Sequence, residues 1–208
     1  KLEGTQTKWK KDANGRIVEL DLRDSSFPMT DLGTLADLSA LKKLILANMA
    51  ITDAEVQEIG RFKRLRDLDL RGCQISNQGL TELHSLSELR VLKLSGENGD
   101  TSVDDDGMKA LTRLSQLRAL YLDHLWISED GLVHFAALPD LQELYLARSL
   151  VGDEAISEIA KFPKLKKLRI SGTQVTSAGL ESLTALPQLE ELDLSENSQI
   201  FDAGMSAI

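Results

Sequence analysis

Residues 165–188 read LKKLRISGTQVTSAGLESLTALPQ, and this stretch holds every signal that decides the fold. It opens with a Leu-x-x-Leu-x-Ile run, whose apolar spacing is typical of a short strand. After a turn, Leu180, Leu183 and Leu186 lie three residues apart, a spacing that indicates one stripe of a helix. The stretch therefore predicts a unit made of a strand, a turn, a helix and a second turn.

The same unit recurs along nearly the whole chain. Six of the seven intervals between its starts are 24 residues long, and the fourth is 28. A repeat of this length predicts a solenoid, in which stacked units bury together the two faces that one unit could not bury alone. The eight units begin at Ile17, Leu41, Leu65, Leu89, Leu117, Leu141, Leu165 and Leu189.

The stacking also predicts the shape. Strands spaced about 4.8 Å apart and helices about 10 Å across differ in width, so the stack must curve with its parallel sheet on the concave side and its helices outside. Thr52 followed by Glu55 fits a capping box at a helix start, and three residues in the same register are expected N-caps: Ser76, Ser128 and Thr176. Five glycines just inside the helices are expected where neighbouring turns approach closely: Gly79, Gly107, Gly131, Gly179 and Gly204.

The repeated pattern L-x-x-L-x-L-x-x-T-x-V/I-T/S-x-x-G-L-x-x-L-x-x-L-P-x, from Ile17 to Ile208, resembles that of leucine-rich repeat proteins. The variant is similar to repeats of planctomycete-type bacterial proteins. It is also related to the cysteine-containing repeats of F-box substrate receptors, but only Cys73 occupies the matching ninth position. The resemblance implies an α/β fold, a right-handed solenoid shaped as a horseshoe, bacterial origin, and a secreted, periplasmic or cell-surface location.

Composition agrees with one acidic repeat domain. The chain has 208 residues, 42% of them apolar and only 4% aromatic, with a net charge of −9. One cysteine excludes an internal disulfide, and no apolar run approaches the ~18 residues of a membrane span. Phosphate-loop, dinucleotide and zinc motifs are missing from the sequence, and the three histidines do not form a triad, so we expect no cofactor and no enzyme activity.

The two ends of the chain differ. Residues 1–16 are expected to form a capping hairpin that covers the open edge of the first repeat, leaving residues 17–208 as the repeat domain. The last repeat stops after Met205 and Ile208 without a polar capping element. We therefore expect a continuation of the chain or a bound partner at that end.

The concave sheet is the expected binding surface, because the leucines of each strand point into the core and the residues between them are displayed. Two tyrosines occupy the same position on adjacent strands of a chain that has few aromatic residues, and charged residues surround them. Tyr, Trp and Arg often anchor protein interfaces, although paired tyrosines also stabilise a sheet and Trp126 could simply cover the insertion beside it. The predicted partner-binding residues are Lys93, Tyr121, Asp123, His124, Trp126, Tyr145, Arg148 and Arg169.

A basic stripe runs through the second position of the units, at Lys42, Arg66, Arg90, Arg118 and Lys166. Nucleic acid is not the expected partner, because acidic residues fill much of the third position and the net charge repels phosphates. The stripe is interpreted as ion-pair partners, as a docking edge for an acidic protein, or as a solvated face of mixed charge.

The longer fourth unit carries an acidic insertion within residues 97–106. Calcium would find oxygen ligands there, but the spacing departs from known calcium loops, so no metal site is predicted. The insertion is expected to be a mobile loop beside the tyrosines.

Three functions follow from this surface. The favoured one is a non-catalytic module that binds a protein partner on its concave sheet. In the second, a glycan-binding or cell-surface scaffold, Tyr121, Tyr145 and Trp126 stack on sugar rings, while Asp123, Arg148 and Asp193 bind hydroxyls. In the third, the array is a regulatory arm of a larger multidomain protein.

Overall fold

The computed structural model describes residues 7–23 and 25–201 and contains one nine-stranded sheet whose strand order follows the chain. Eight strands run parallel in a constant register, with Leu20 beside Leu44 and Leu44 beside Leu68. Across the insertion, Leu92 pairs with Leu120. These strands are β2 (Ile17–Asp21), β3 (Lys43–Ile45), β4 (Asp67–Asp69), β5 (Val91–Ser95), β6 (Ala119–Asp123), β7 (Glu143–Tyr145), β8 (Lys167–Arg169) and β9 (Glu191–Asp193).

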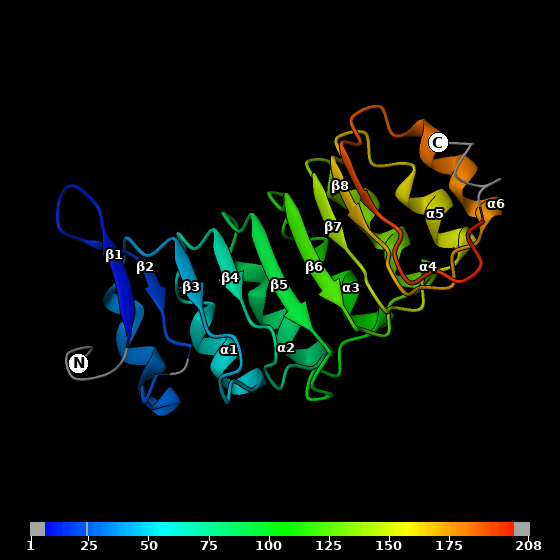
Figure 1. Ribbon diagram of the computed structural model, residues 1–208. Helices are drawn as coiled ribbons and strands as arrows, with labels where there is room; N and C mark the ends of the chain where they lie inside the picture. Colours follow the sequence, from blue (N-terminus) through cyan, green and yellow to red (C-terminus); the bar gives the residue numbers. More distant parts are fainter. Residues whose placement is uncertain (1–6, 24, 202–208) are drawn as a thin grey trace.

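Helices lie on one side of the sheet along the whole row, as Figure 1 shows, so the predicted α/β solenoid is confirmed. The α-helices are α1 (Asp53–Ile59), α2 (Asn77–Glu82), α3 (Asp105–Leu111), α4 (Glu129–Leu132), α5 (Asp153–Ile159) and α6 (Ser177–Leu180). Short 3-10 helices are η1 (Met29–Asp37), η2 (Leu83–Ser85), η3 (Val133–Ala137) and η4 (Glu181–Ala185). None of the described helices is long and apolar enough to cross a membrane.

The helices differ from the expected α-helices in one respect: the first repeat uses only the 3-10 helix η1, and three others change to 3-10 geometry after a short α-helix. The apolar spacing permits this change but does not decide it, because the units of α1, α3 and α5 have the same spacing and contain no 3-10 helix. Side chains three residues apart eclipse one another in a 3-10 helix, so a stripe such as Leu80, Leu83 and Leu86 stays buried when the backbone tightens.

One apolar core runs the length of the array. The strand leucines Leu65, Leu68 and Leu70 and the helix residues behind them are fully buried, and the same layer repeats in each neighbouring coil. At the last coil, Leu192 and Leu194 are only partly buried. Met205 and Ile208, on which the expectation of an uncapped end rests, lie outside the described residues, as does Gly204.

Side-chain caps join one coil to the next. Thr52 and Glu55 form the predicted capping box of α1, and the predicted N-caps Ser76, Ser128 and Thr176 are also present. Asp53 at the start of α1 accepts a hydrogen bond of 2.9 Å from the backbone of Ser76, and Asp105 and Asp153 bind the next coils in the same way. At four of the predicted close-approach glycines, an added Cβ atom would overlap a side chain of the preceding coil, which is Asp53, Asn77, Asp105 or Asp153. In the same order, these glycines are Gly79, Gly107, Gly131 and Gly179.

The N-terminal edge of the sheet carries an antiparallel hairpin. Strand β1 (Lys8–Lys11) pairs with β2, and in the turn between them Gly15 has a φ of 77°. Asp12 stabilises the turn by accepting hydrogen bonds from the backbone of Asn14 and Arg16. The hairpin is formed with the strand of the first repeat, and the division into a capping segment and a repeat domain at residue 16 stays a prediction.

Candidate functional site

The fifth positions of four successive units form a row on the face of the sheet that is turned away from the helices. We call this the inner face. Lys93 pairs in register with Tyr121, Tyr121 with Tyr145, and Tyr145 with Arg169. Each of the four side chains is partly or largely exposed, whereas the leucines on either side of them in sequence are buried. The sheet therefore presents this row of four residues, the central row, away from the core.

The two tyrosine rings stack on each other. Their centroids are 4.1 Å apart and their planes differ by 7°, and Lys93 Nζ lies 4.4 Å from the centroid of the Tyr121 ring. Aromatic stacking and cation–π contact both stabilise such an arrangement. Because Lys93 and Tyr145 approach from strands on opposite sides of β6, both faces of the Tyr121 ring are occupied.

Glu143 holds the polar ends of both rings. Its Oε2 accepts hydrogen bonds from the hydroxyls of Tyr121, at 3.2 Å, and Tyr145, at 3.5 Å. Burial raises the pKa of Tyr121, and the neighbouring Tyr145 and Glu143 raise it further. The Tyr121 phenol consequently remains protonated and acts as a donor at neutral pH.

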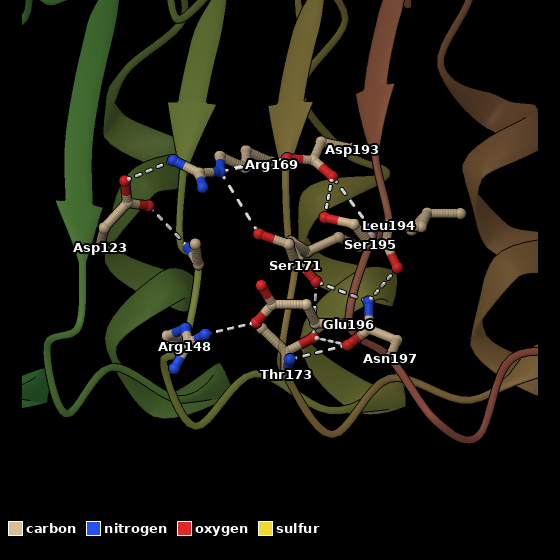
Figure 2. Close-up of polar contacts among 12 residues, drawn as sticks. Asp123, Arg148, Arg169, Ser171, Thr173, Asp193, Leu194, Ser195, Glu196 and Asn197 are labelled. Atoms are coloured by element: carbon tan, nitrogen blue, oxygen red, sulfur yellow. Dashed lines mark hydrogen bonds and ion pairs between the residues drawn. The ribbon is translucent and has the colours of Figure 1, made fainter.

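Arg169 lies between two carboxylates (Figure 2). Its Nη1 donates to Asp123 Oδ2 at 3.2 Å and its Nε donates to Asp193 Oδ2 at 3.1 Å. The other oxygen of Asp123 accepts a hydrogen bond of 2.7 Å from the backbone of Ala147. Burial raises the pKa of Asp123, although Ala147 and Arg169 act in the opposite direction.

His124 and Arg148 lie in the turn just after the strands and have left-handed backbones, with φ of 60° and 55°. Gly72 and Gly172 occupy the same position in other units. Asn48 and Glu196 have the same backbone at the same position, so the left-handed conformation belongs to the turn of the repeat and is unfavourable for each of these non-glycine residues. Arg148 also forms an ion pair of 2.6 Å with Glu196 (Figure 2).

A hollow of ≈ 660 Å³ lies beside the central row at the carboxyl ends of the strands. Tyr121, Asp123, His124 and Arg169 line one part of it. The sequence reasoning missed the other part, in which Arg71 is fixed by two hydrogen bonds to Asp69 of 2.9 and 2.7 Å. An Asp-x-Arg pair begins at the last residue of both β2 and β4, and this recurrence was the available signal. The missed lining residues are Arg23, Ala47, Asn48, Arg71, Gly72 and Ser95, whereas Glu97 and Asn98 belong to the insertion that was expected beside the tyrosines.

Trp126 is separated from the other predicted site residues. Its side chain is 68% exposed, it does not line the hollow, and its backbone forms an isolated bridge with Asp104. Leu150, 40% exposed, occupies the same position of the next unit. Six of the predicted residues thus gather around the central row and the hollow, Arg148 lies at their margin, and Trp126 faces elsewhere.

Polar side chains of the insertion form hydrogen bonds with the neighbouring coils. Asp104 caps α3 and also accepts a hydrogen bond from Asn77, whereas Asp105 binds Ser128 of the next coil. Thr101 is buried and donates to the backbone of Cys73. Among the residues that the structure describes, no three His, Cys, Asp or Glu side chains gather to hold a metal ion.

Comparisons with known proteins agree with this architecture. A family profile described as a leucine-rich repeat region matches residues 19–206. Internalin C2 from Listeria monocytogenes is similar in structure, with a TM-score of 0.65 and 27% identity over 81% of this chain and 67% of that one. The ectodomain of the Arabidopsis receptor kinase HAESA, solved in complex with a peptide hormone, has a TM-score of 0.61 and 19% identity over 91% of this chain and 36% of that one. The search of curated proteins gives no match.

Proposed function

The chain belongs to the leucine-rich repeat family, and from this we propose that it is a non-catalytic module that binds a protein partner on the inner face of its sheet. The observation that carries the proposal is the central row of Lys93, Tyr121, Tyr145 and Arg169, which is accessible and held in place by its own contacts. Ordered aromatic and arginine side chains are typical anchors of protein interfaces, because little entropy is lost when they bind.

A protein partner fits this row better than a glycan. A sugar ring stacks on an open aromatic face, but Lys93 and Tyr145 cover the two faces of Tyr121. The row also offers the charged groups of Lys93 and Arg169, which suit a protein partner better than a sugar ring. Trp126 does have an open side chain, but it lies outside the row.

An extended peptide segment is the form of partner that we propose. The HAESA ectodomain in its peptide complex shares only the fold with this chain, and it supports the idea that such a scaffold accommodates a peptide. The inner face of this chain is a run of parallel strands along which an extended segment could contact several coils in turn.

Catalysis is disfavoured by the geometry around His124. The residue lies beside Asp123 at the margin of an open hollow, on a surface that water reaches freely. Acid–base chemistry needs a positioned substrate in a site that limits water, which an open sheet does not supply.

A random peptide display selection against the full chain tests the proposal. Selected peptides should bind the unaltered protein and should lose binding to a Tyr121→Ala/Tyr145→Ala double variant. Val133→Ala, which alters an exposed side chain on the helical side, is the matched control and should retain binding. Thermal unfolding followed by circular dichroism checks folding, and Lys93→Ala/Arg169→Ala replaces the tyrosine variant if that variant is unstable. Peptides that bind both row variants as tightly as the unaltered chain would reject the proposal.

A further inference from the structure

A second hollow, of ≈ 370 Å³, lies in the middle of the inner face. It exists because the third position of two adjacent units is small: Val91 and Ala119 stand where the other six units have Glu, Lys or Asp. Val91 and Ala119 line this hollow together with Lys93 and Tyr121 of the central row. We call it the central depression; it is distinct from the hollow at the strand ends.

Two cations at the central depression lack the ion pairs that similar residues have elsewhere. Lys43 pairs with Asp67 at 2.8 Å and Lys167 with Glu191 at 2.7 Å, in each case with the third position of the next coil. Lys93 lies in the fifth position instead, where its neighbour Asp69 already pairs with Arg71 and its other neighbour is Tyr121. Among the described residues, no carboxylate forms an ion pair with Lys93, whose ammonium contacts only the Tyr121 ring.

Arg118 lacks an ion pair for a different reason. In the coil two units earlier, Arg66 pairs at 2.8 Å with Glu88, the residue that precedes the next coil. The equivalent residue for Arg118 is Asp140, but Asp140 pairs with Lys164. Within the described part of the chain Arg118 forms no ion pair, and it is exposed beside the central depression.

One buried polar atom of a residue that lines the central depression is also unsatisfied. Asp67 Oδ1 has no hydrogen-bond partner among the residues described, and Asp67 lines the depression. A buried polar atom without a partner is unfavourable, so this oxygen points to a ligand that supplies a donor.

We propose that the central depression is the subsite for an acidic side chain, Glu or Asp, of the partner protein. The inference rests on the proposed function and adds the chemistry of one contact. The methylene groups of the side chain would lie on Val91 and Ala119, and the carboxylate would accept charge-assisted hydrogen bonds from Arg118 and Lys93. A backbone N–H of the same peptide would reach Asp67 Oδ1. The net charge of −9 opposes a polyanion, so the site suits a single acidic side chain rather than a run of phosphates.

The peptide selection described above also tests this subsite. Peptides that depend on the tyrosines should share an Asp or Glu at a fixed place, and Arg118→Ser should weaken their binding about tenfold. Arg113→Ser, which removes the same charge from an exposed arginine near the helices, is the matched control and should leave binding unchanged. Repeating the selection with Arg118→Glu should replace the acidic residue by Lys or Arg at the same place, an outcome that a purely structural role for Arg118 would not produce.

The outcomes separate the two proposals. Tyrosine-dependent peptides with no fixed acidic residue would overturn the subsite and leave the binding module standing. A selection with no tyrosine-dependent peptide would overturn both. Binding of a labelled single-stranded oligonucleotide that is lost in Arg118→Ser would assign the depression to phosphate groups and would overturn the acidic side chain as its ligand.

Discussion

Arg169 reaches across strand β7 to bind Asp123, although 46 residues separate the two in the chain. The contact joins coils that are not direct neighbours, and Asp193 holds the same guanidinium from the other side. Side chains fixed in this way lose little conformational freedom when a partner binds. The inner face is thus organised before binding.

Asp123 should make stability depend on pH in the acidic range. Its raised pKa means that the folded chain holds this proton more tightly than the unfolded chain does. The contribution of Asp123 to the free energy of unfolding therefore falls as pH rises from the ordinary value of 3.8 through the raised pKa. Urea unfolding at several pH values should show this slope in the difference between the unaltered chain and Asp123→Asn. A constant difference would contradict the prediction.

Gly79→Ala should destabilise the fold by about 1–3 kcal/mol, because the added methyl group would overlap Asp53 Oδ1 and disturb its hydrogen bond to Ser76. Gly152→Ala is the control: it lies at the start of α5 with φ of −120°, and its nearest neighbour would be 3.8 Å from the new atom. Urea denaturation should separate the two variants, and equal stabilities would contradict the close approach.

His124→Gly should be more stable than His124→Ala by about 1 kcal/mol, because both lose the imidazole but only glycine adopts the left-handed backbone without strain. Thermal or urea unfolding of the two variants measures the difference. The same pair of substitutions at Glu181, an exposed residue with an ordinary helical φ of −55°, serves as a control in which glycine has no such advantage. An alanine variant as stable as the glycine variant would show that the turn is not strained.

Cys73 should be unreactive in the folded chain. Burial raises the pKa of its thiol to about 12, and Sγ lies 3.3 Å from the carbonyl oxygen of Leu46, to which it donates. The thiolate is the reactive form, so a disulfide reagent at pH 8 should modify Cys73 only as the chain unfolds. Modification measured along a urea gradient should follow the circular dichroism transition. Rapid labelling without urea would contradict the buried position.

The sequence predicted the repeat, the parallel sheet, the helix caps and the close-approach glycines, because each depends on residues at a fixed spacing. It did not predict the 3-10 helices, since a stripe such as Leu80, Leu83 and Leu86 is compatible with either helix until packing selects one.

The candidate site was harder to predict. The strand period placed Tyr121 and Tyr145 side by side correctly, but it could not place Trp126, which lies in a turn where side-chain direction does not follow that period. The bridge from Arg169 to Asp123 depends on side-chain rotamers across three coils, and the central depression depends on two small residues whose effect appears only in three dimensions.

The constant register from β2 to β9 has a consequence for how this protein can diverge. Each coil contributes one residue to each row of the inner face. Buried leucines, which are not part of that face, fix the backbone position of this residue. A point mutation at a partly exposed residue of this face such as Lys93 or Ile45 can therefore exchange one contact and leave the adjacent coils where they are. New binding preferences can accumulate one mutation at a time on an inherited scaffold.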